Sequence, residues 1–403
     1  MQDKLISVIG LFTMLFIAWL FSNNKKKIDF RSIAGGLFLQ FILAYFVLHT
    51  NFGKAFFAMA TTAITSVVET TDIGSKFVFG ENFKDHFYVF KVLPTIIFMS
   101  SLSYIFFYFG IIQRVVKVLA WIMLKTMNIS GCESLVTAAN IFLGQTEAPL
   151  FIKPYLKTMT RSEVMTMMTS GMATVAGGVL AAYIGLGVPA GHLLAASIMS
   201  APAAIMLSKI IYPETQESPT KGSVKVHFEV KEVNIFESAC SGASAGLNLA
   251  LNVGAMLITF IALIALINKS LTIFHFLFGW DLTLESMLGT LFQPIAFLIG
   301  IPWSESALVG ELLGKKMVIN EFIAYVDLLN YRDTGLLSER SVNICTYALC
   351  GFANFSSIAI QIGGIGALEP SRRADFAKCG FKALIGGTLA GFMTACMAGI
   401  LIS

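Results

Sequence analysis

Residues 144–149 read Gly144-Gln145-Thr146-Glu147-Ala148-Pro149, a polar hexapeptide set between apolar stretches. A carboxylate such as that of Glu147 is costly inside a membrane, so an ionisable residue at that depth indicates a functional site. The glycine and the proline favour a break in the helix. Backbone groups freed by a break are tolerated at membrane depth only where protein or a water-filled cavity satisfies them. We therefore expect the hexapeptide to line a binding cavity.

The composition of the whole chain is that of a polytopic membrane protein. Of its 403 residues, 56% are hydrophobic and only 13% are charged, whereas a soluble domain carries roughly 25% charged residues. The net charge of +4 is spread over short clusters, so the chain lacks the basic face that nucleic-acid binding needs. No motif of ATP hydrolysis or of a hydrolase is present. We therefore expect neither an enzyme nor a bound organic cofactor.

Apolar runs long enough to cross a membrane, about 20 residues each, predict eight transmembrane helices. They cover residues 4–22, 32–50, 89–111, 164–186, 192–212, 245–267, 341–363 and 380–402. Two further apolar segments, 132–160 and 283–322, are interrupted near the middle by polar and helix-breaking residues and fit re-entrant hairpins. Residues 53–70 and 111–128 are amphipathic and are expected along the membrane interface, the alternative being a short soluble connector.

Lysines and arginines predict the orientation of the chain, because they accumulate in short cytoplasmic loops. Five clusters fall on one side if the N-terminus is outside, which places both termini outside the cytoplasmic membrane. These clusters are Lys25–Lys27 with Arg31, Arg114 with Lys117 and Lys125, Lys153 with Lys157 and Arg161, Lys209 with Lys221, Lys225 and Lys231, and Arg372 with Arg373 and Lys378. Arg332 and Arg340 are exceptions, since this orientation places them outside.

The two halves of the chain share an order of interruptions. In the first half, the break at 144–149 precedes a span interrupted at 174–178. In the second half, a break at 301–306 precedes a span interrupted at 351–357. Paired interruptions in two halves are typical of an inverted repeat in a secondary transporter, with the binding site near the middle of the membrane.

The first break offers the chemistry of a site for a polar organic solute. Gln145, Thr146 and Glu147 supply an amide, a hydroxyl and a carboxylate, and polar groups of this kind discriminate because leaving them unpaired is costly. The alternative is that Thr146 or Glu147 caps a helix at the hairpin tip.

Glu321 follows the second hairpin in an otherwise apolar run. An ionised carboxylate only accepts hydrogen bonds, through two oxygens, and this suits the vicinal hydroxyls of a sugar. An ion pair with Lys315 or Lys316 is the alternative.

Asn354 and Ser357 lie in the interrupted span 341–363, three residues apart and hence on one helix face. Phe352 and Phe355 flank them, and an aromatic ring beside polar donors suits a flat ligand. Packing between helices through small polar residues is the alternative.

Asn140 and Thr174 stand near the first two interruptions. Their oxygens, together with carbonyls freed by unwinding, have the layout expected for a Na⁺ ion coupled to transport; a satisfied buried asparagine is the alternative. Ser304 and Glu305 follow Pro302, where a capping role competes with substrate contact, and we leave them out of the site.

Four motifs together resemble the concentrative nucleoside transporters, of the bacterial, sodium-coupled type. They are Gly144–Pro149, Gly171–Gly177, Asn320–Tyr325 and Gly351–Ser357, and the similarity in order and spacing extends over essentially the whole chain. The resemblance implies a homotrimer in which a scaffold holds the subunits and a transport domain moves like an elevator. We accordingly expect residues 1–128 mainly in the scaffold and 129–403 mainly in the transport core, with the helix near 245–267 in the scaffold.

The resemblance also implies roles for individual residues. The nucleobase would contact Gln145, Thr146 and Glu147 and pack against Val179. The ribose would be held by Glu321, Asn354 and Ser357, with Phe352 nearby. Sodium would bind the side chains of Asn140 and Thr174 and the carbonyls of Leu143 and Val175. A proton-coupled nucleoside carrier and a cation-coupled carrier of another polar solute are the alternatives.

Overall fold

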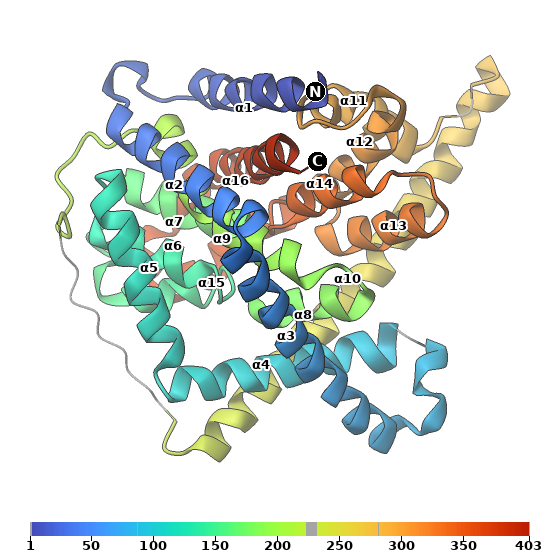
Figure 1. Cartoon of the computed structure of the whole chain (residues 1–403), viewed down its shortest axis with the longest axis horizontal. Coiled ribbons are helices and arrows are strands. Elements are labelled where there is room, and N and C mark those ends of the chain that lie inside the picture. The colour runs from blue at the N-terminus through green and yellow to red at the C-terminus, as the bar shows by residue number, and fades with distance from the viewer. Residues whose placement is uncertain (1, 87, 223–231, 281, 403) are drawn as a thin grey trace.

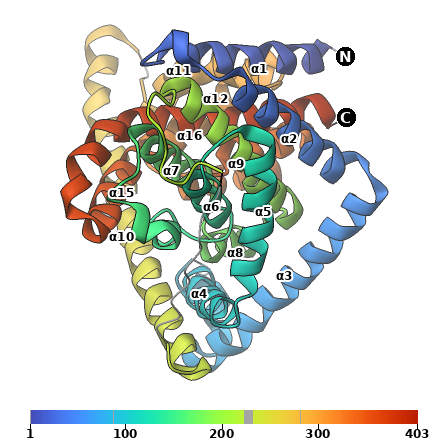
Figure 2. The ribbon, with the colours of Figure 1, turned by 90° about the vertical axis from the view of Figure 1, so that its left-hand side faces the viewer.

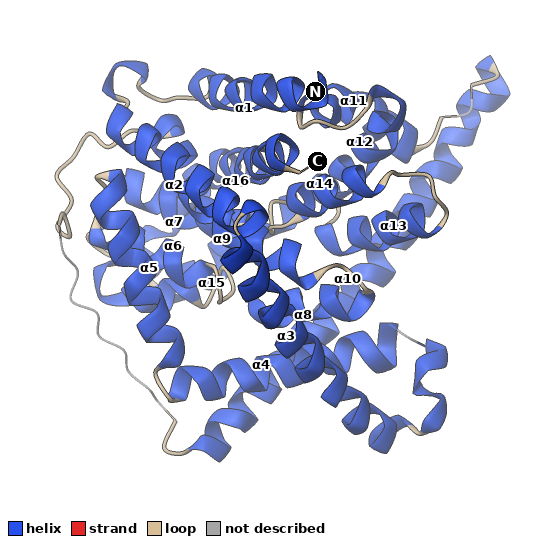
Figure 3. Cartoon of the chain, in the orientation of Figure 1, coloured by secondary structure: helices blue, strands red, loops and turns tan. Residues whose placement is uncertain are grey.

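The computed structural model describes residues 2–86, 88–222, 232–280 and 282–402, and within them it contains helices and no strands (Figures 1 and 3). The helices, in chain order, are α1 Gln2–Leu20, α2 Phe30–His49, α3 Asn51–Phe79, α4 Leu93–Tyr108, α5 Ile111–Met127, α6 Gly131–Asn140, α7 Arg161–Ala173, α8 Gly177–Leu186, α9 Ala190–Ile211, α10 Ile235–Phe278, α11 Leu284–Leu298, α12 Trp303–Val318, α13 Glu321–Asp333, α14 Glu339–Leu349, α15 Phe355–Leu368 and α16 Arg373–Leu401. Short 3₁₀ or π segments are η1 Lys25–Lys27, η2 Glu81–His86, η3 Tyr88–Val92, η4 Ala148–Tyr155 and η5 Pro370–Arg372.

The predicted all-helical membrane fold is confirmed. In the described part of the chain, seven helices are long and apolar enough to cross a membrane. They match seven of the eight predicted spans. The predicted span 341–363 is instead α14 and α15, of 11 and 14 residues, because the chain is unwound between them. The N- and C-termini lie close together in both ribbon views (Figures 1 and 2).

Several helix ends predicted from hydropathy were wrong. The segment predicted at 53–70 is the 29-residue α3, and the span predicted at 245–267 is the 44-residue α10. Each helix continues until a glycine with positive φ ends it: Gly80 for α3 and Gly279 for α10. Isolated polar residues do not stop a helix, whereas a residue that adopts the left-handed conformation does.

Both predicted hairpins are present, with turns a few residues earlier than expected. In hairpin 1, α6 is followed by a turn at 141–147 and then by η4. In hairpin 2, α11 and α12 meet at a bend of 118°. The predicted break at 301–306 was partly wrong, because Trp303 already begins α12 and the turn includes Gly300 at φ +102°.

Helices α4 and α10 pack closely, and α10 runs across the molecule from the lower left to the upper right of Figure 1. A Cβ on Gly242 would lie 2.6 Å from the Cα of Ser101, and one on Gly246 would lie 2.7 Å from the Cα of Ile97. This glycine pair, separated by three residues, lets the two backbones approach, as small residues do in membrane helix pairs. The two helices form the wall of a cavity whose opposite side is hairpin 1.

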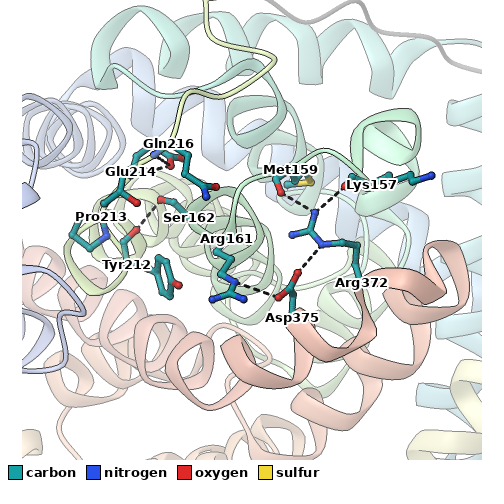
Figure 4. Close-up of a pocket in the computed structure, with 11 residues that line it drawn as sticks. Lys157, Met159, Arg161, Ser162, Tyr212, Pro213, Glu214, Gln216, Arg372 and Asp375 are labelled. Atoms are coloured by element: carbon teal, nitrogen blue, oxygen red, sulfur yellow. Dashed lines mark hydrogen bonds and ion pairs between the residues drawn. The ribbon is translucent and has the colours of Figure 1, made fainter.

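The positive clusters can be followed only in part. Lys225 and Lys231 lie outside the described residues. Lys157, Arg161 and Arg372, from two different clusters, line one pocket together with residues 212–216 (Figure 4). Segments that the sequence placed on the same side of the membrane are therefore neighbours in the structure.

Candidate functional site

Three interrupted elements meet in the interior: the turn of hairpin 1, the break between α7 and α8, and the break between α14 and α15. The Gly177 amide donates to the Phe142 carbonyl over 3.0 Å, and the Phe352 amide donates to the Thr174 carbonyl over 3.3 Å. Backbone groups that each break frees are thus satisfied by a neighbouring break, as burial requires. The three interruptions form one structural unit.

Gly351 is required for this contact. Its φ of +122° is a conformation that side chains with a Cβ rarely adopt. A Cβ there would also lie 2.8 Å from the Ala173 carbonyl oxygen, at the end of α7. The close approach places residues 352–357 beside the first interrupted helix.

A chain of hydrogen bonds joins hairpin 1 to α15. Gln145 Nε2 donates to Ser357 Oγ over 3.2 Å. Ser357 also lies at the first turn of α15, where its amide donates to Asn354 Oδ1 over 2.9 Å. Asn354 therefore caps α15 with its oxygen and keeps its amide nitrogen for another partner.

That partner is Glu321, the first residue of α13. Asn354 Nδ2 donates to Glu321 Oε2 over 3.2 Å, and the Tyr183 hydroxyl of α8 donates to Oε1 over 2.7 Å. Glu321 is only 4% exposed, so Asn354 and Tyr183 are the hydrogen-bond partners of a buried carboxyl group. Four of the predicted substrate residues, Gln145, Ser357, Asn354 and Glu321, are thus brought together.

The alternative role for Glu321, an ion pair with a neighbouring lysine, is wrong in this structure. Lys315 pairs with Glu311 at 2.6 Å and with Asp327 at 2.7 Å. Lys316 donates to the Ala348 carbonyl over 2.8 Å. Among the described residues, no lysine lies within ion-pair distance of Glu321, and its two carboxyl oxygens accept hydrogen bonds from Tyr183 and Asn354 instead.

Sequence reasoning missed two residues of this network, Tyr183 and Gln361. Gln361 Nε2 donates to Gln145 Oε1 over 2.9 Å. Both are helix neighbours of predicted residues, because Tyr183 lies four positions after Val179 and Gln361 four after Ser357. The spacing of one helical turn could have drawn attention to them.

Glu147 lies apart from the network. Its carboxylate rests against Gly144, where a Cβ would collide with it. It lines a cavity of about 680 Å³ between hairpin 1, the α7–α8 break and the wall of α4 and α10. Glu147 makes no side-chain capping bond to η4, although its carboxyl group accepts from backbone amides of the turn at Gly144 and Glu147.

Thr146 and Val179 occupy the surroundings of the network. The Thr146 methyl lies against Gly364 of α15, which has no Cβ to obstruct it. Val179, 4% exposed, lies on α8 one turn before Tyr183. Phe352 is partly buried and packs against the apolar core. Thr146 and Val179 thus lie next to Gln145 in sequence and one helical turn before Tyr183, respectively.

The predicted cation residues lie where two helices end. Helix α6 ends at Asn140 and α7 ends at Ala173, next to Thr174, and the C-terminal ends of helices are negative. Asn140 Nδ2 donates to Ser170 Oγ over 3.0 Å, whereas its Oδ1 is buried with no hydrogen-bond partner. The satisfied-asparagine alternative is therefore wrong, because the oxygen that would bind a cation is unpaired.

The carbonyls of Leu143 and Val175, which are predicted to bind sodium, also have no hydrogen-bond partner among those described for the backbone. Within the described residues, no backbone hydrogen bond outside the helices ends on the Leu143 or Val175 oxygen. Thr174 Oγ1 donates to the Ser170 carbonyl over 2.9 Å, which leaves its lone pairs available. Oxygens without hydrogen-bond donors are a suitable ligand set for a hard cation.

Arg372 fixes the base of hairpin 1 to α16 (Figure 4). Its Nη1 donates to the carbonyls of Leu156 at 3.2 Å, Lys157 at 3.1 Å and Met159 at 2.8 Å, and its Nε pairs with Asp375 at 2.8 Å. One side chain thus satisfies the orphan carbonyls at the end of η4. Hairpin 1 and α16 are therefore expected to move together.

Replacing Arg372 by methionine should loosen this base. A hydrogen bond from a charged group contributes about 1.5–3 kcal/mol, so we expect a lower melting temperature and faster hydrogen exchange in residues 150–160. Arg373→Met, at the exposed neighbouring position, is the matched control. Unchanged exchange in the Arg372 variant would contradict the assigned role.

Comparison with known proteins identifies the family. The model of the Na⁺-dependent nucleoside transporter C-terminus matches residues 192–399, that of the N-terminus matches residues 9–82, and a nucleoside recognition (Gate) model matches residues 89–190. The chain belongs to the Na⁺-dependent nucleoside transporter family. It is accordingly a membrane transporter of the concentrative nucleoside transporter type and not an enzyme.

Relatives of this transporter occur in bacteria and in vertebrates. An uncharacterized transporter of Haemophilus influenzae is 44% identical over 100% of this chain and 98% of its own length. The nucleoside permease NupC of Helicobacter pylori is 40% identical, with 99% and 98% coverage. Solute carrier family 28 member 3 of Eptatretus stoutii is 43% identical over 99% of this chain, which spans only 61% of that longer protein.

Solved structures confirm the architecture. The structure of CNTnw in an inward-facing substrate-bound state superposes with a TM-score of 0.93, at 39% identity and with coverage of 99% of this chain and 98% of that one. CNTnw in an outward-facing state gives a TM-score of 0.94. The interrupted helices of this transporter therefore belong to a known transport fold.

Proposed function

We propose that this transporter imports nucleosides across the cytoplasmic membrane together with Na⁺. The hydrogen-bond chain from Gln145 through Ser357 and Asn354 to Glu321 is the observation that carries the proposal. It joins an amide suited to a nucleobase with a carboxylate suited to sugar hydroxyls. A nucleoside carries both partners, because its nucleobase and its hydroxyl-bearing sugar are covalently linked.

The base would contact Gln145, Thr146 and Glu147 and pack on Val179. The ribose hydroxyls would bind Glu321, Asn354 and Ser357, beside Phe352. Both oxygens of Glu321 already accept one hydrogen bond each from the protein. A carboxylate has about four acceptor positions, so two remain for ribose. A free base would leave these positions unpaired and bind poorly.

Sodium would bind Asn140 Oδ1, Thr174 Oγ1 and the carbonyls of Leu143 and Val175. Coupling would follow from the shared breaks. The same unwound segment that carries Thr174 accepts from the Phe352 amide and lies beside Phe142 of hairpin 1. An ion that orders this segment would order both halves of the nucleoside site. Sodium would raise nucleoside affinity, and nucleoside would raise sodium affinity by the same factor.

Transport would proceed by an elevator movement of residues 129–403, apart from α10, against a scaffold of residues 1–128 and α10. The cavity between hairpin 1 and the α4–α10 pair would then lie between the two moving parts, which supports this proposal. Most of α10 is exposed in the single chain, which suits contact with lipid or with other subunits of a homotrimer. Both termini would lie outside the cytoplasm.

Uptake into proteoliposomes tests this function. The purified full chain should accumulate labelled uridine when an inward Na⁺ gradient is imposed, and not when K⁺ replaces Na⁺ or when only a pH gradient is present. Uptake driven by protons alone would support a proton-coupled carrier. Na⁺-driven uptake of a different solute, without uptake of uridine or adenosine, would overturn the proposed substrate.

Gly171→Ala should weaken uridine binding by disturbing the contact between Gln361 and Gln145. A Cβ at this position on α7 would lie 2.8 Å from Gln361 Nε2 and 3.0 Å from Gln145 Cβ, so the two side chains would have to separate. We expect uridine affinity to fall by about 10-fold, the value of one lost hydrogen bond with some strain. Calorimetry measures the change. Gly363→Ala on α15, where an added Cβ meets open space, should bind as the unmodified protein does.

A further inference from the structure

Gln361 is buried beneath the nucleoside site and has a distinctive set of partners. It is 0% exposed. Its amide nitrogen donates to the Met168 carbonyl over 3.0 Å and to Gln145 Oε1 over 2.9 Å, while its own oxygen is buried without a partner. Both amide hydrogens are therefore used, and both point toward acceptors.

The Met168 carbonyl determines the direction of these bonds. A carbonyl oxygen only accepts hydrogen bonds, so the nitrogen of Gln361, not its oxygen, must face Met168. The same nitrogen faces Gln145, which must then turn its oxygen toward Gln361. The remaining end of the Gln145 amide, its NH₂ group, consequently faces Ser357 Oγ at 3.2 Å.

The direction of these hydrogen bonds also determines the role of the Ser357 hydroxyl. Because Ser357 Oγ accepts from Gln145, its own hydrogen is available for donation, and among the described residues it donates to no protein acceptor. Ser357 is 1% exposed, so an unused donor there is costly unless a ligand accepts from it. Glu321, at the other end of the network, offers only acceptors.

We propose that Gln361 is a positioning residue that orients Gln145 and makes Ser357 a hydrogen-bond donor to the ligand. The site then presents a donor at Ser357 and an acceptor at Glu321, joined through Asn354. A sugar hydroxyl matches this pair, because it accepts through its oxygen and donates through its hydrogen. Gln361, which never touches the nucleoside, thereby sets the preference for hydroxyl-bearing sugars. The inference rests on the proposed nucleoside binding.

The test compares the affinities of uridine, 2′-deoxyuridine and 3′-deoxyuridine for the purified full chain in NaCl. Gln361→Met removes the amide and keeps the length of the side chain. We expect uridine affinity to fall about 5- to 10-fold, the value of one hydrogen bond. The penalty for deleting a hydroxyl should also shrink, toward that in Ser357→Ala. The double variant Gln361→Met/Ser357→Ala should bind within 2-fold of Ser357→Ala, since Gln361 acts through the Ser357 hydroxyl that Ser357→Ala already removes.

A matched control is available in α2. Gln40 is also 0% exposed, donates through its nitrogen to Thr394 Oγ1 at 3.1 Å and has an unpaired oxygen. Gln40→Met should leave the ratio of uridine to deoxyuridine affinities unchanged. Equal losses for uridine and for both analogues in Gln361→Met, or the same behaviour in both methionine variants, would overturn the proposal.

A ligand-free measurement separates this inference from the proposed function. If the unmodified chain binds no nucleoside, the proposed function fails. Gln361 is then judged by melting temperatures of Gln361→Met, Gln145→Ala and their combination. Shifts that are clearly less than additive would uphold the orienting contact, because the second change removes a bond already lost. Additive shifts would overturn it.

Discussion

Glu321→Gln should weaken uridine binding by about 100-fold. The substitution removes the charge that ribose hydroxyls would use, and hydrogen bonds to a charged group contribute about 1.5–3 kcal/mol. It also presents an NH₂ group to Tyr183 or Asn354, which both donate to the carboxylate. Two donors then face each other in a buried site, which adds to the loss. Calorimetry on the purified chain at saturating Na⁺ measures the effect.

The control for this variant is Glu305→Gln, the same chemical change on α12. Glu305 accepts from the Ser338 hydroxyl over 3.0 Å and lies outside the proposed site. The uridine affinity of the Glu305→Gln variant should therefore stay within about 2-fold of the unmodified value. Glu321→Gln should also keep its dependence on Na⁺, however weak the binding. Uridine affinity close to that of the control would remove Glu321 from the ribose site.

Asn140→Ala should abolish the effect of Na⁺ on nucleoside affinity. The substitution deletes the buried Oδ1 that has no partner in the protein. In the absence of Na⁺ the variant should bind uridine as the unmodified chain does. Raising Na⁺ should then change nothing, whereas the unmodified chain should gain about 5- to 150-fold, the usual range of coupling between two sites. Titrations of uridine at several Na⁺ concentrations measure both.

Two comparisons show whether Asn140 acts through the ion. Potassium at equal concentration should leave the affinity of the unmodified chain at its Na⁺-free value. Asn268→Ala, on α10 far along the chain from the three breaks, removes another asparagine that bonds Glu285 and should keep the Na⁺ effect. A full Na⁺ effect in Asn140→Ala would show that the cation binds elsewhere.

The sequence predicts the interrupted elements well because their signals are local. A glycine, a proline or a polar run inside an apolar segment has few explanations in a membrane, and breaks were expected near Gln145, Thr174 and Asn354. The predicted ends of α3 and α10 were wrong, because the hydropathy of the sequence falls before the backbone conformation changes. Gly80 and Gly279, with φ of +86° and +72°, mark the true ends.

The sequence cannot give pairings between distant helices. Tyr183 and Glu321 are 138 residues apart, and Gln145 and Gln361 are 216 apart. Tyr183 lies in an apolar run, where an aromatic residue is the ordinary core choice. Gln361 is a lone amide on a helix that also carries several glycines. Only the fold shows that these two side chains hold Glu321 and Gln145 in place.

A structure of the full chain with uridine and Na⁺ tests the central claim most directly, because that claim is about position. The account predicts ribose oxygens within hydrogen-bond distance of Glu321 and Ser357 and the base beside Gln145, with an ion at Asn140 Oδ1. Uridine bound in the α4-side cavity or in the pocket around Arg372, without contact to Glu321, would contradict it.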